Sequence, residues 1–187
     1  MRASPARRLR LERLENRLAP ATFTVLNNND AGPDSLWQAI LDANLTAVAD
    51  TINFDAALTN QTITLSSSEL AITKPVTITG LGSVKLTIDA NNASRIFNID
   101  DGTTAKIAIS ISGLKLTHGA SNSSGGGILN KEALTIANCL LDQNSASGSY
   151  GGGISNSGAV TVTNSTLSSN FASNLGGGIY NSGTLAR

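Results

Sequence analysis

A glycine triplet followed by isoleucine occurs three times at nearly equal spacing, and it constrains the fold more than any other feature of this sequence. The segments GGGILNKE, GGGISNSG and GGGIYNSG begin at Gly125, Gly151 and Gly176, so the repeat is 26 residues long and then 25. A Gly-rich loop that grips a nucleotide phosphate needs only one copy, placed between a strand and a helix. Here each triplet leads into another predicted strand. The triplets therefore predict repeated corners, where glycine allows positive φ and close backbone packing.

Apolar residues recur in step with the triplets. Short segments such as VTIT, VKLTID and LKLT place apolar side chains two residues apart, which is typical of strands with one buried face. Three sets recur at the repeat spacing, and each predicts one inward column of a solenoid: Ile111, Ile136 and Val162; Leu116, Leu141 and Leu167; Leu114, Cys139 and Ser165. The predicted fold is all-β, a right-handed parallel β-helix, with the hand following from strand twist and crossover rules.

Asparagine repeats with the same period. Three sets lie one coil apart: Asn130, Asn156 and Asn181; Asn138 and Asn164; Asn144 and Asn170. Each set predicts a ladder, because stacked amides can hydrogen-bond along the axis of repeated strands. Several Asn-x-Ser/Thr segments also match glycosylation acceptors, but chance matches are expected in a chain this rich in Asn, Ser and Thr. The repeat residues to which we assign a structural role are Gly125, Gly126, Gly127, Gly151, Gly152, Gly153, Gly176, Gly177, Gly178, Asn130, Asn156 and Asn181.

A short helix is predicted over residues 34–44, ahead of the repeats. Ser35 and Gln38 have the spacing of a capping box, in which both side chains satisfy backbone groups at a helix start. One apolar face is expected from residues at helical spacing: Leu36, Trp37, Ile40 and Leu41. We expect this helix to cap the first coil.

Charge is scarce and unevenly distributed. Of the 187 residues 14% are charged and the net charge is zero, yet residues 1–20 hold six Arg and two Glu. We interpret residues 1–20 as a basic leader or targeting segment, although it lacks the apolar core of a secretory signal peptide. Residues 21–187 then form one mildly acidic β-helix domain, with regular coils of 25–26 residues from 105 to 187. The acidic body argues against nucleic acid as a partner.

Three further features bound the interpretation. Cys139 is the only cysteine, so no internal disulfide is possible, and its column makes it a small core residue. No run of apolar residues is long enough to span a membrane. The repeat continues to Arg187 without a polar coil or helix to close it. We therefore expect a fragment of a longer protein, or self-association through the last coil.

Two stretches resemble known bacterial segments. The run from Thr24 to Phe54 resembles the N-terminal module of β-helix proteins with a C-S-L-R-E-A signature, although Asp34 replaces the Cys and Trp37 the Arg. The matching residues are Ser35, Leu36, Gln38, Ala39 and Ile40. The GGGI coils resemble repeats of polymorphic outer-membrane proteins and other autotransporter passengers, and LERLENRLAPA resembles an N-terminal segment of planctomycete surface proteins. These resemblances imply a secreted or surface-located bacterial β-solenoid, associated with the outer membrane; they imply no ligand and no catalytic residues.

The parallel β-helix is also used by polysaccharide lyases and glycoside hydrolases. Their chemistry needs converging carboxylates, often with Ca²⁺, and a basic residue. The candidates on the chain are Asp89, Asp100, Asp101, Glu132, Asp142, Arg95 and His118. For an enzyme we would expect Asp89, Arg95, Asp100 and Asp101 to converge. Simpler readings are that Asp100, Asp101 and Gly102 make a turn and that His118 is an isolated, solvated loop residue.

The function that the sequence favours is that of a non-catalytic, adhesin-like protein without cofactor or metal. It would present a long flat face to polysaccharide or to a surface protein. A polysaccharide-degrading enzyme is the alternative.

Overall fold

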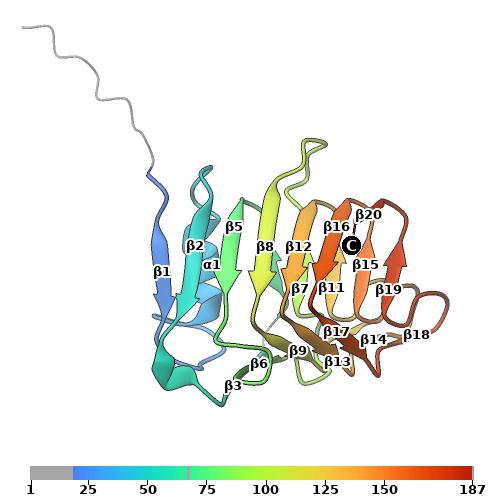
Figure 1. Cartoon of the computed structure of the whole chain (residues 1–187), viewed down its shortest axis with the longest axis horizontal. Helices are drawn as coiled ribbons and strands as arrows, with labels where there is room; N and C mark the ends of the chain where they lie inside the picture. The colour runs from blue at the N-terminus through green and yellow to red at the C-terminus, as the bar shows by residue number, and fades with distance from the viewer. Residues whose placement is uncertain (1–18, 67, 187) are drawn as a thin grey trace, which may run out of the picture.

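The chain forms a parallel β-solenoid of about six turns, and this confirms the predicted all-β parallel β-helix with a short N-terminal capping helix. The computed structural model describes residues 19–66 and 68–186, and most of the predicted leader falls outside them. Figure 1 shows the strands side by side along the long axis, in the order of the chain. Every strand pairing between coils is parallel.

Four sheets run along the axis. Sheet A contains β1 (Thr22–Val25), β2 (Asp50–Phe54), β5 (Val76–Thr79), β8 (Ala108–Ser112), β12 (Ala133–Ala137), β16 (Ala159–Thr163) and β20 (Thr184–Ala186). Sheet B contains β3 (Gln61–Thr64), β6 (Leu86–Asp89), β9 (Lys115–Thr117), β13 (Leu140–Asp142) and β17 (Thr166–Ser168). Sheet C contains β4 (Leu70–Ile72), β7 (Phe97–Ile99), β11 (Ile128–Asn130), β15 (Ile154–Asn156) and β19 (Ile179–Asn181). Sheet D, at the corner between B and C, contains β10 (Ala120–Ser121), β14 (Ser145–Ala146) and β18 (Phe171–Ala172).

The core follows the predicted columns. Ile136 pairs with Ile111 on one side and with Val162 on the other, and Leu141 stands likewise between Leu116 and Leu167. Because equivalent residues of adjacent coils are paired, each inward side chain packs on its counterpart in the next coil. Leu141 is accordingly 0% exposed. Burial also raises the pKa of the Cys139 thiol, in agreement with a core role rather than a nucleophilic one.

The glycine triplets form the corners that lead into sheet C, and each of their three positions needs glycine. Gly125 has a φ of +75°, in the left-handed region that side chains disfavour. A Cβ on Gly126 would lie 2.4 Å from the carbonyl oxygen of Ser145. A Cβ on Gly127 would lie 2.6 Å from the carbonyl oxygen of Gly153 in the next coil. Close approach of backbones therefore explains the triplet without any ligand.

Two of the three predicted asparagine ladders are present. Nδ2 of Asn130 donates to Oδ1 of Asn156 at 2.5 Å, and Nδ2 of Asn156 donates to Oδ1 of Asn181 at 2.6 Å. Nδ2 of Asn144 donates to Oδ1 of Asn170 at 3.0 Å. Asn138 and Asn164 repeat for another reason: both adopt positive φ, 52° and 47°, which asparagine tolerates at turns.

Helix α1 (Leu36–Ala43) begins where the capping box predicts. The Ser35 hydroxyl accepts from the backbone N–H of Gln38 at 3.2 Å, but the Gln38 side chain donates to Asp42 instead of reciprocating. The prediction for Leu41 was wrong, because this side chain is 39% exposed. The buried face instead comprises Leu36, Ala39, Ile40 and Ala43.

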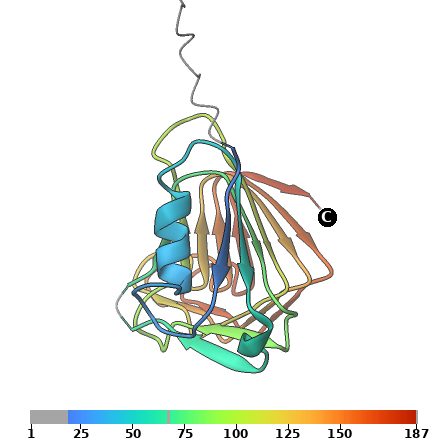
Figure 2. The ribbon, with the colours of Figure 1, turned by 90° about the vertical axis from the view of Figure 1, so that its left-hand side faces the viewer.

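The N-terminal segment covers the first coil on all three of its sides. Strand β1 pairs with β2, and Figure 2 shows α1 lying beside the first strands. The Asn44 side chain, at the helix C-cap, donates to the Ala71 carbonyl at 2.8 Å and accepts from the Thr73 N–H at 2.9 Å, so it pairs with the free edge of β4. On the third side, Nδ2 of Asn28 donates to the Thr62 carbonyl of β3 at 3.2 Å. Each edge strand of the first coil therefore has at least one hydrogen-bond partner in the N-terminal segment. The short 3₁₀ helix η1 (Ala56–Leu58) follows β2.

Candidate functional site

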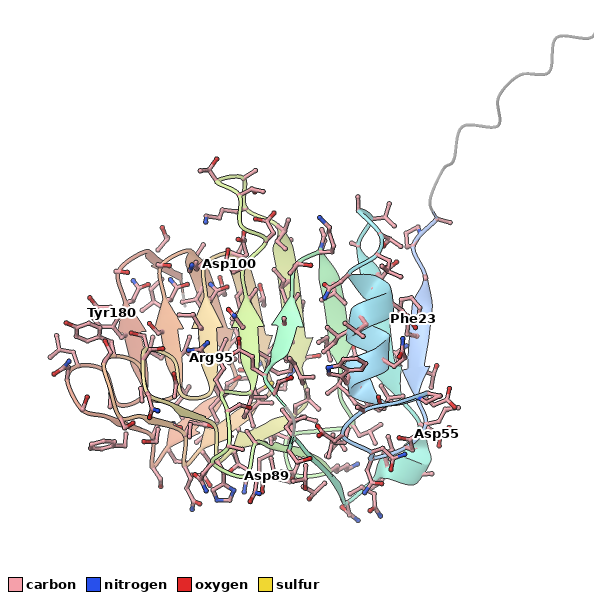
Figure 3. All side chains as sticks on the ribbon, turned by 180° about the vertical axis from the view of Figure 1, so that it is seen from behind. Phe23, Asp55, Asp89, Arg95, Asp100 and Tyr180 are labelled. Carbon is pink, nitrogen blue, oxygen red and sulfur yellow. The ribbon has the colours of Figure 1, made fainter. Side chains whose placement is uncertain are left out.

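The residues expected to converge in an enzyme lie in three separate places. Figure 3 shows Asp89 at one edge of the molecule, Arg95 in the middle of the same view and Asp100 at the opposite edge. Each is engaged by a different set of neighbours.

Asp100 and Asp101 belong to a turn, as the simpler reading predicted. The Gly102 N–H donates to Oδ1 of Asp100 at 2.9 Å and the Thr103 N–H donates to Oδ1 of Asp101 at 2.7 Å. The Lys131 ammonium lies 2.7 Å from Oδ2 of Asp100, and its hydrogen bond lowers the pKa of this carboxyl group. These contacts account for both carboxylates as parts of a loop.

Glu132 lies beneath this turn and is 0% exposed. Its Oε1 accepts from the Asp101 N–H at 3.3 Å and its Oε2 accepts from the Ile107 N–H at 3.1 Å, so it fastens the loop to the solenoid. Oxygen atoms of Asp100, Asp101 and Glu132 all lie within 4.8 Å of one another, a geometry that a divalent cation could use. Backbone N–H groups and Lys131 already explain the carboxylates without one.

His118 is not isolated, and the prediction that it is a solvated loop residue was wrong. Its Nδ1 lies 3.0 Å from Oδ2 of Asp89, and its Nε2 lies 2.8 Å from Oε1 of Gln143. The hydrogen bond with Asp89 is the main cause that raises the pKa of His118. Because both partners are acceptors, the arrangement suits an imidazolium that bridges three successive coils.

A column on the outer face of sheet B places Asp89 and Asp142 on either side of Thr117. The sequence predicted Thr117 and Ser168 as the neighbours of Asp142, and the register confirms both. The sequence did not predict that Asp89 lies in the same column, on the other side of Thr117. The Thr117 hydroxyl is buried without a hydrogen-bond partner in the described part of the chain, and Lys115 lies 3.7 Å from Asp142.

Arg95 lies at the wall of a polar recess of about 290 Å³. The recess is lined by Glu69, by the turn 92–95 and by residues 120–122. The Arg95 side chain is only 10% exposed, and its Nη1 donates to Oε2 of Glu69 at 2.8 Å. Its other donors reach Oγ of Ser121 at 3.0 Å, and Ser123, Ser124 and Gly125. Because so many partners hold the guanidinium, it forms a fixed part of the recess wall.

The recess offers hydrogen-bonding groups without net charge. Glu69 neutralises Arg95, and its Oε1 accepts from Nδ2 of Asn98 at 2.7 Å, while Oδ1 of Asn98 is buried without a hydrogen-bond partner among residues 19–66 and 68–186. The amides of Asn92 and Asn122 are exposed at the rim. Such a set can donate to and accept from hydroxyl groups of a neutral molecule. Sequence reasoning missed Glu69 and Asn98, although the spacing of 26 residues between Glu69 and Arg95 matches one coil.

The expected long flat face corresponds to the outer surface of sheet A. Its register stacks two rows of uncharged residues, all of them polar except Ala137: Thr22, Thr51, Thr77, Ser110, Thr135 and Thr161; Thr24, Asn53, Thr79, Ser112, Ala137 and Thr163. A shallow depression of about 290 Å³ follows the middle of this face. The rows offer a broad contact surface but no convergent groups that would orient a ligand.

No protein-family model, no curated protein and no solved structure matches the chain. The resemblances to the C-S-L-R-E-A module, to polymorphic outer-membrane repeats and to planctomycete leaders therefore stay predictions, while the β-solenoid is established by the fold. In the described part of the chain, no helix has the length and apolar character needed to cross a membrane.

Proposed function

We propose that this chain is a non-catalytic, secreted or surface-located bacterial β-solenoid that binds neutral polysaccharide. The observation that carries the proposal is the rigid, charge-neutral recess at Arg95. Binding sites of this kind combine a preformed shape with a few fixed polar groups. Here the Arg95–Glu69 ion pair and its serine neighbours are fixed by hydrogen bonds before any ligand arrives.

The charge balance of the recess favours neutral sugars over anionic ligands. A nucleic acid or a polyuronate would need cations that remain available to its phosphate or carboxylate groups. The Arg95 guanidinium is instead committed to Glu69 and to oxygen acceptors of the chain. Hydroxyl groups of a neutral sugar, by contrast, can use the Glu69 oxygens as acceptors and the rim amides as both donors and acceptors.

Binding can be tested with two matched pairs of variants. Asn92 and Asn60 are both exposed and both have positive φ, 57° and 64°, so Asn92→Gly removes a rim amide and Asn60→Gly is its control outside the recess. Asn122→Ala removes the second rim amide, whose Oδ1 accepts from Oγ of Ser147 at 3.2 Å, and Asn28→Ala is its control, since Asn28 is also exposed and its side chain also makes one hydrogen bond. Affinity electrophoresis in gels that contain galactomannan, xyloglucan, laminarin or polygalacturonate measures retardation.

We expect retardation by at least one neutral polymer, and a loss of about twofold to tenfold in affinity for each recess variant, since a hydrogen bond contributes roughly 0.5–1.5 kcal/mol. The two control variants should behave as the parent. Retardation by no neutral polymer, or equal weakening by recess variants and controls, would overturn the proposal.

A polysaccharide-degrading enzyme is the second candidate, and one observation favours it. Asp89 and Asp142 lie in one column of sheet B, two coils apart, and His118 contacts Asp89. Two strand spacings are about 9–10 Å, close to the separation of roughly 6.5–9.5 Å between the carboxyl groups of inverting glycosidases. Release of reducing ends or unsaturated products that is lost in Asp89→Asn and Asp142→Asn variants would favour this candidate over the first.

The surface or secreted location is part of the same proposal. Protease treatment of intact producing cells, followed by detection of the chain, tests it. We expect the chain to be digested or found in the medium, whereas full protection in intact cells would contradict a surface or secreted role.

A further inference from the structure

We propose that the stacked rings of Tyr150 and Tyr180 form a second subsite, which binds a sugar ring of the same carbohydrate chain that enters the Arg95 recess. This inference rests on the proposed function. The two ring centroids lie 4.4 Å apart and the ring planes are inclined by 19°. Both side chains are partly exposed, so the pair presents aromatic surface to the outside.

The aromatic pair lies on the same corner of the solenoid as the recess. Nε of Arg95 donates to the Gly125 carbonyl at 3.1 Å, and the Gly125 N–H donates to the Tyr150 carbonyl at 2.9 Å. These two contacts connect three successive coils. Figure 3 shows Arg95 and Tyr180 on the same side of the molecule, one after the other along the axis. Strand spacing places Tyr150 about 10 Å along the axis from Arg95.

The chemistry of the pair fits a sugar ring. A pyranose has a face of C–H groups that packs on an aromatic ring, while its hydroxyls remain at the edge for hydrogen bonds. Within the described residues, no hydrogen bond holds the hydroxyl of either Tyr150 or Tyr180, so both phenols are available to donate and accept. Leu175 follows Tyr150 in the next coil, joined by the N–H of Gly151, and is 61% exposed. Leu175 therefore adds exposed apolar surface in the coil that carries Tyr180.

The two subsites complement each other. The recess supplies directed hydrogen bonds and the platform supplies apolar contact, and a chain that lies parallel to the axis reaches both. Linking two contacts in one molecule makes the second contact intramolecular. Affinity should therefore rise with oligosaccharide length until the chain spans both subsites.

The test uses a size ladder of neutral oligosaccharides. The probes are cello-, manno- and laminari-oligosaccharides from disaccharide to hexasaccharide, measured by titration calorimetry with the full chain. Tyr180→Ala removes one ring, Tyr180→Phe keeps the ring and removes the hydroxyl, and Val84→Ala is the control, since Val84 is an exposed apolar residue on the turn between β5 and β6, away from this corner. Thermal unfolding of each variant is recorded in parallel.

We expect Tyr180→Ala to weaken hexasaccharide binding by roughly threefold to tenfold and to leave disaccharide binding unchanged. Tyr180→Phe should retain most of the affinity, and Val84→Ala all of it. Should Asn92→Gly weaken binding while Tyr180→Ala and Tyr180→Phe do not, the second subsite is wrong and the proposed function stands. Absence of binding to every ladder overturns both.

An unfolded Tyr180→Ala variant would be replaced by Tyr180→Leu, which preserves apolar packing without a flat ring. Loss of length-dependent binding in a folded Tyr180→Leu variant supports the inference, and unchanged binding refutes it. Binding of a protein to the tyrosine pair, with no effect of the Tyr180 variants on any sugar, would likewise refute it.

Discussion

The asparagine ladder of sheet C allows a quantitative test of what holds adjacent coils together. Asn156 is 1% exposed, its Oδ1 accepts from Nδ2 of Asn130 at 2.5 Å, and its own Nδ2 donates to the Gly158 carbonyl at 3.1 Å. Asn156→Leu keeps a similar volume but removes these bonds. Nδ2 of Asn156 also donates to Oδ1 of Asn181 at 2.6 Å, so these three side-chain hydrogen bonds are lost, each of which contributes about 0.5–1.5 kcal/mol. Nδ2 of Asn130 and the Gly158 carbonyl keep other partners.

The expected total for Asn156→Leu is about 1.5–4.5 kcal/mol of unfolding free energy. For a chain of this size a loss of 1 kcal/mol lowers Tm by about 2–4 °C, so we expect Tm to fall by about 3–18 °C. Differential scanning calorimetry measures the shift. Asn174→Ala is the matched control, because Asn174 is exposed and its side chain forms no hydrogen bond in the described part of the chain. A Tm within about 2 °C of the parent for Asn156→Leu would refute the ladder as a source of stability.

Three further changes test the core, the corners and the histidine bridge. Leu141→Asp buries an unpaired charge and should cost several kcal/mol in chemical denaturation, and an unchanged midpoint would contradict the inward column. Gly126→Ala should lower Tm, because its Cβ would meet backbone at 2.4 Å, and calorimetry of this variant checks the close approach at the corner. The pKa of His118 is raised above 6.5 chiefly by the hydrogen bond with Asp89, so its contribution is full below pH 6.5 and is lost as the pH rises through the raised pKa. We therefore expect Tm of the parent to fall relative to that of His118→Asn between about pH 6.5 and 8, and parallel profiles would exclude a charged bridge to Asp89.

Regular spacing made the coils predictable. In a parallel solenoid, a residue one period away lies directly above or below, so equal spacing in the sequence translates into contact. The columns through Ile136 and Leu141 and the ladder through Asn156 follow from this rule, and the register confirms them. Local capping chemistry similarly predicted the helix that begins after Ser35.

Irregular coils limited the prediction of the candidate sites. Asp89 and Thr117 lie in register but are 28 residues apart, because the loop of residues 100–107 lengthens that coil, so the fixed period hid the column. The partner of His118 was missed for the same reason. The exposure of Leu41 depends on how the helix lies against β1, β2 and β4, which helical periodicity does not specify.

The position of the recess within the solenoid is itself an argument for its role. The GGGI coils repeat the same small and apolar residues, and their backbone and asparagine hydrogen bonds connect each coil to the next. Glu69 and Arg95 lie in the less regular coils that precede them, and the third coil contributes Ser121 and Ser123 to the same network. An ion pair between coils is not needed for the fold, because the regular coils stack at this corner without one among the residues that the structure describes. Departures from a local rule tend to mark functional sites. Ligand binding therefore explains the Arg95–Glu69 pair better than the stacking of coils does.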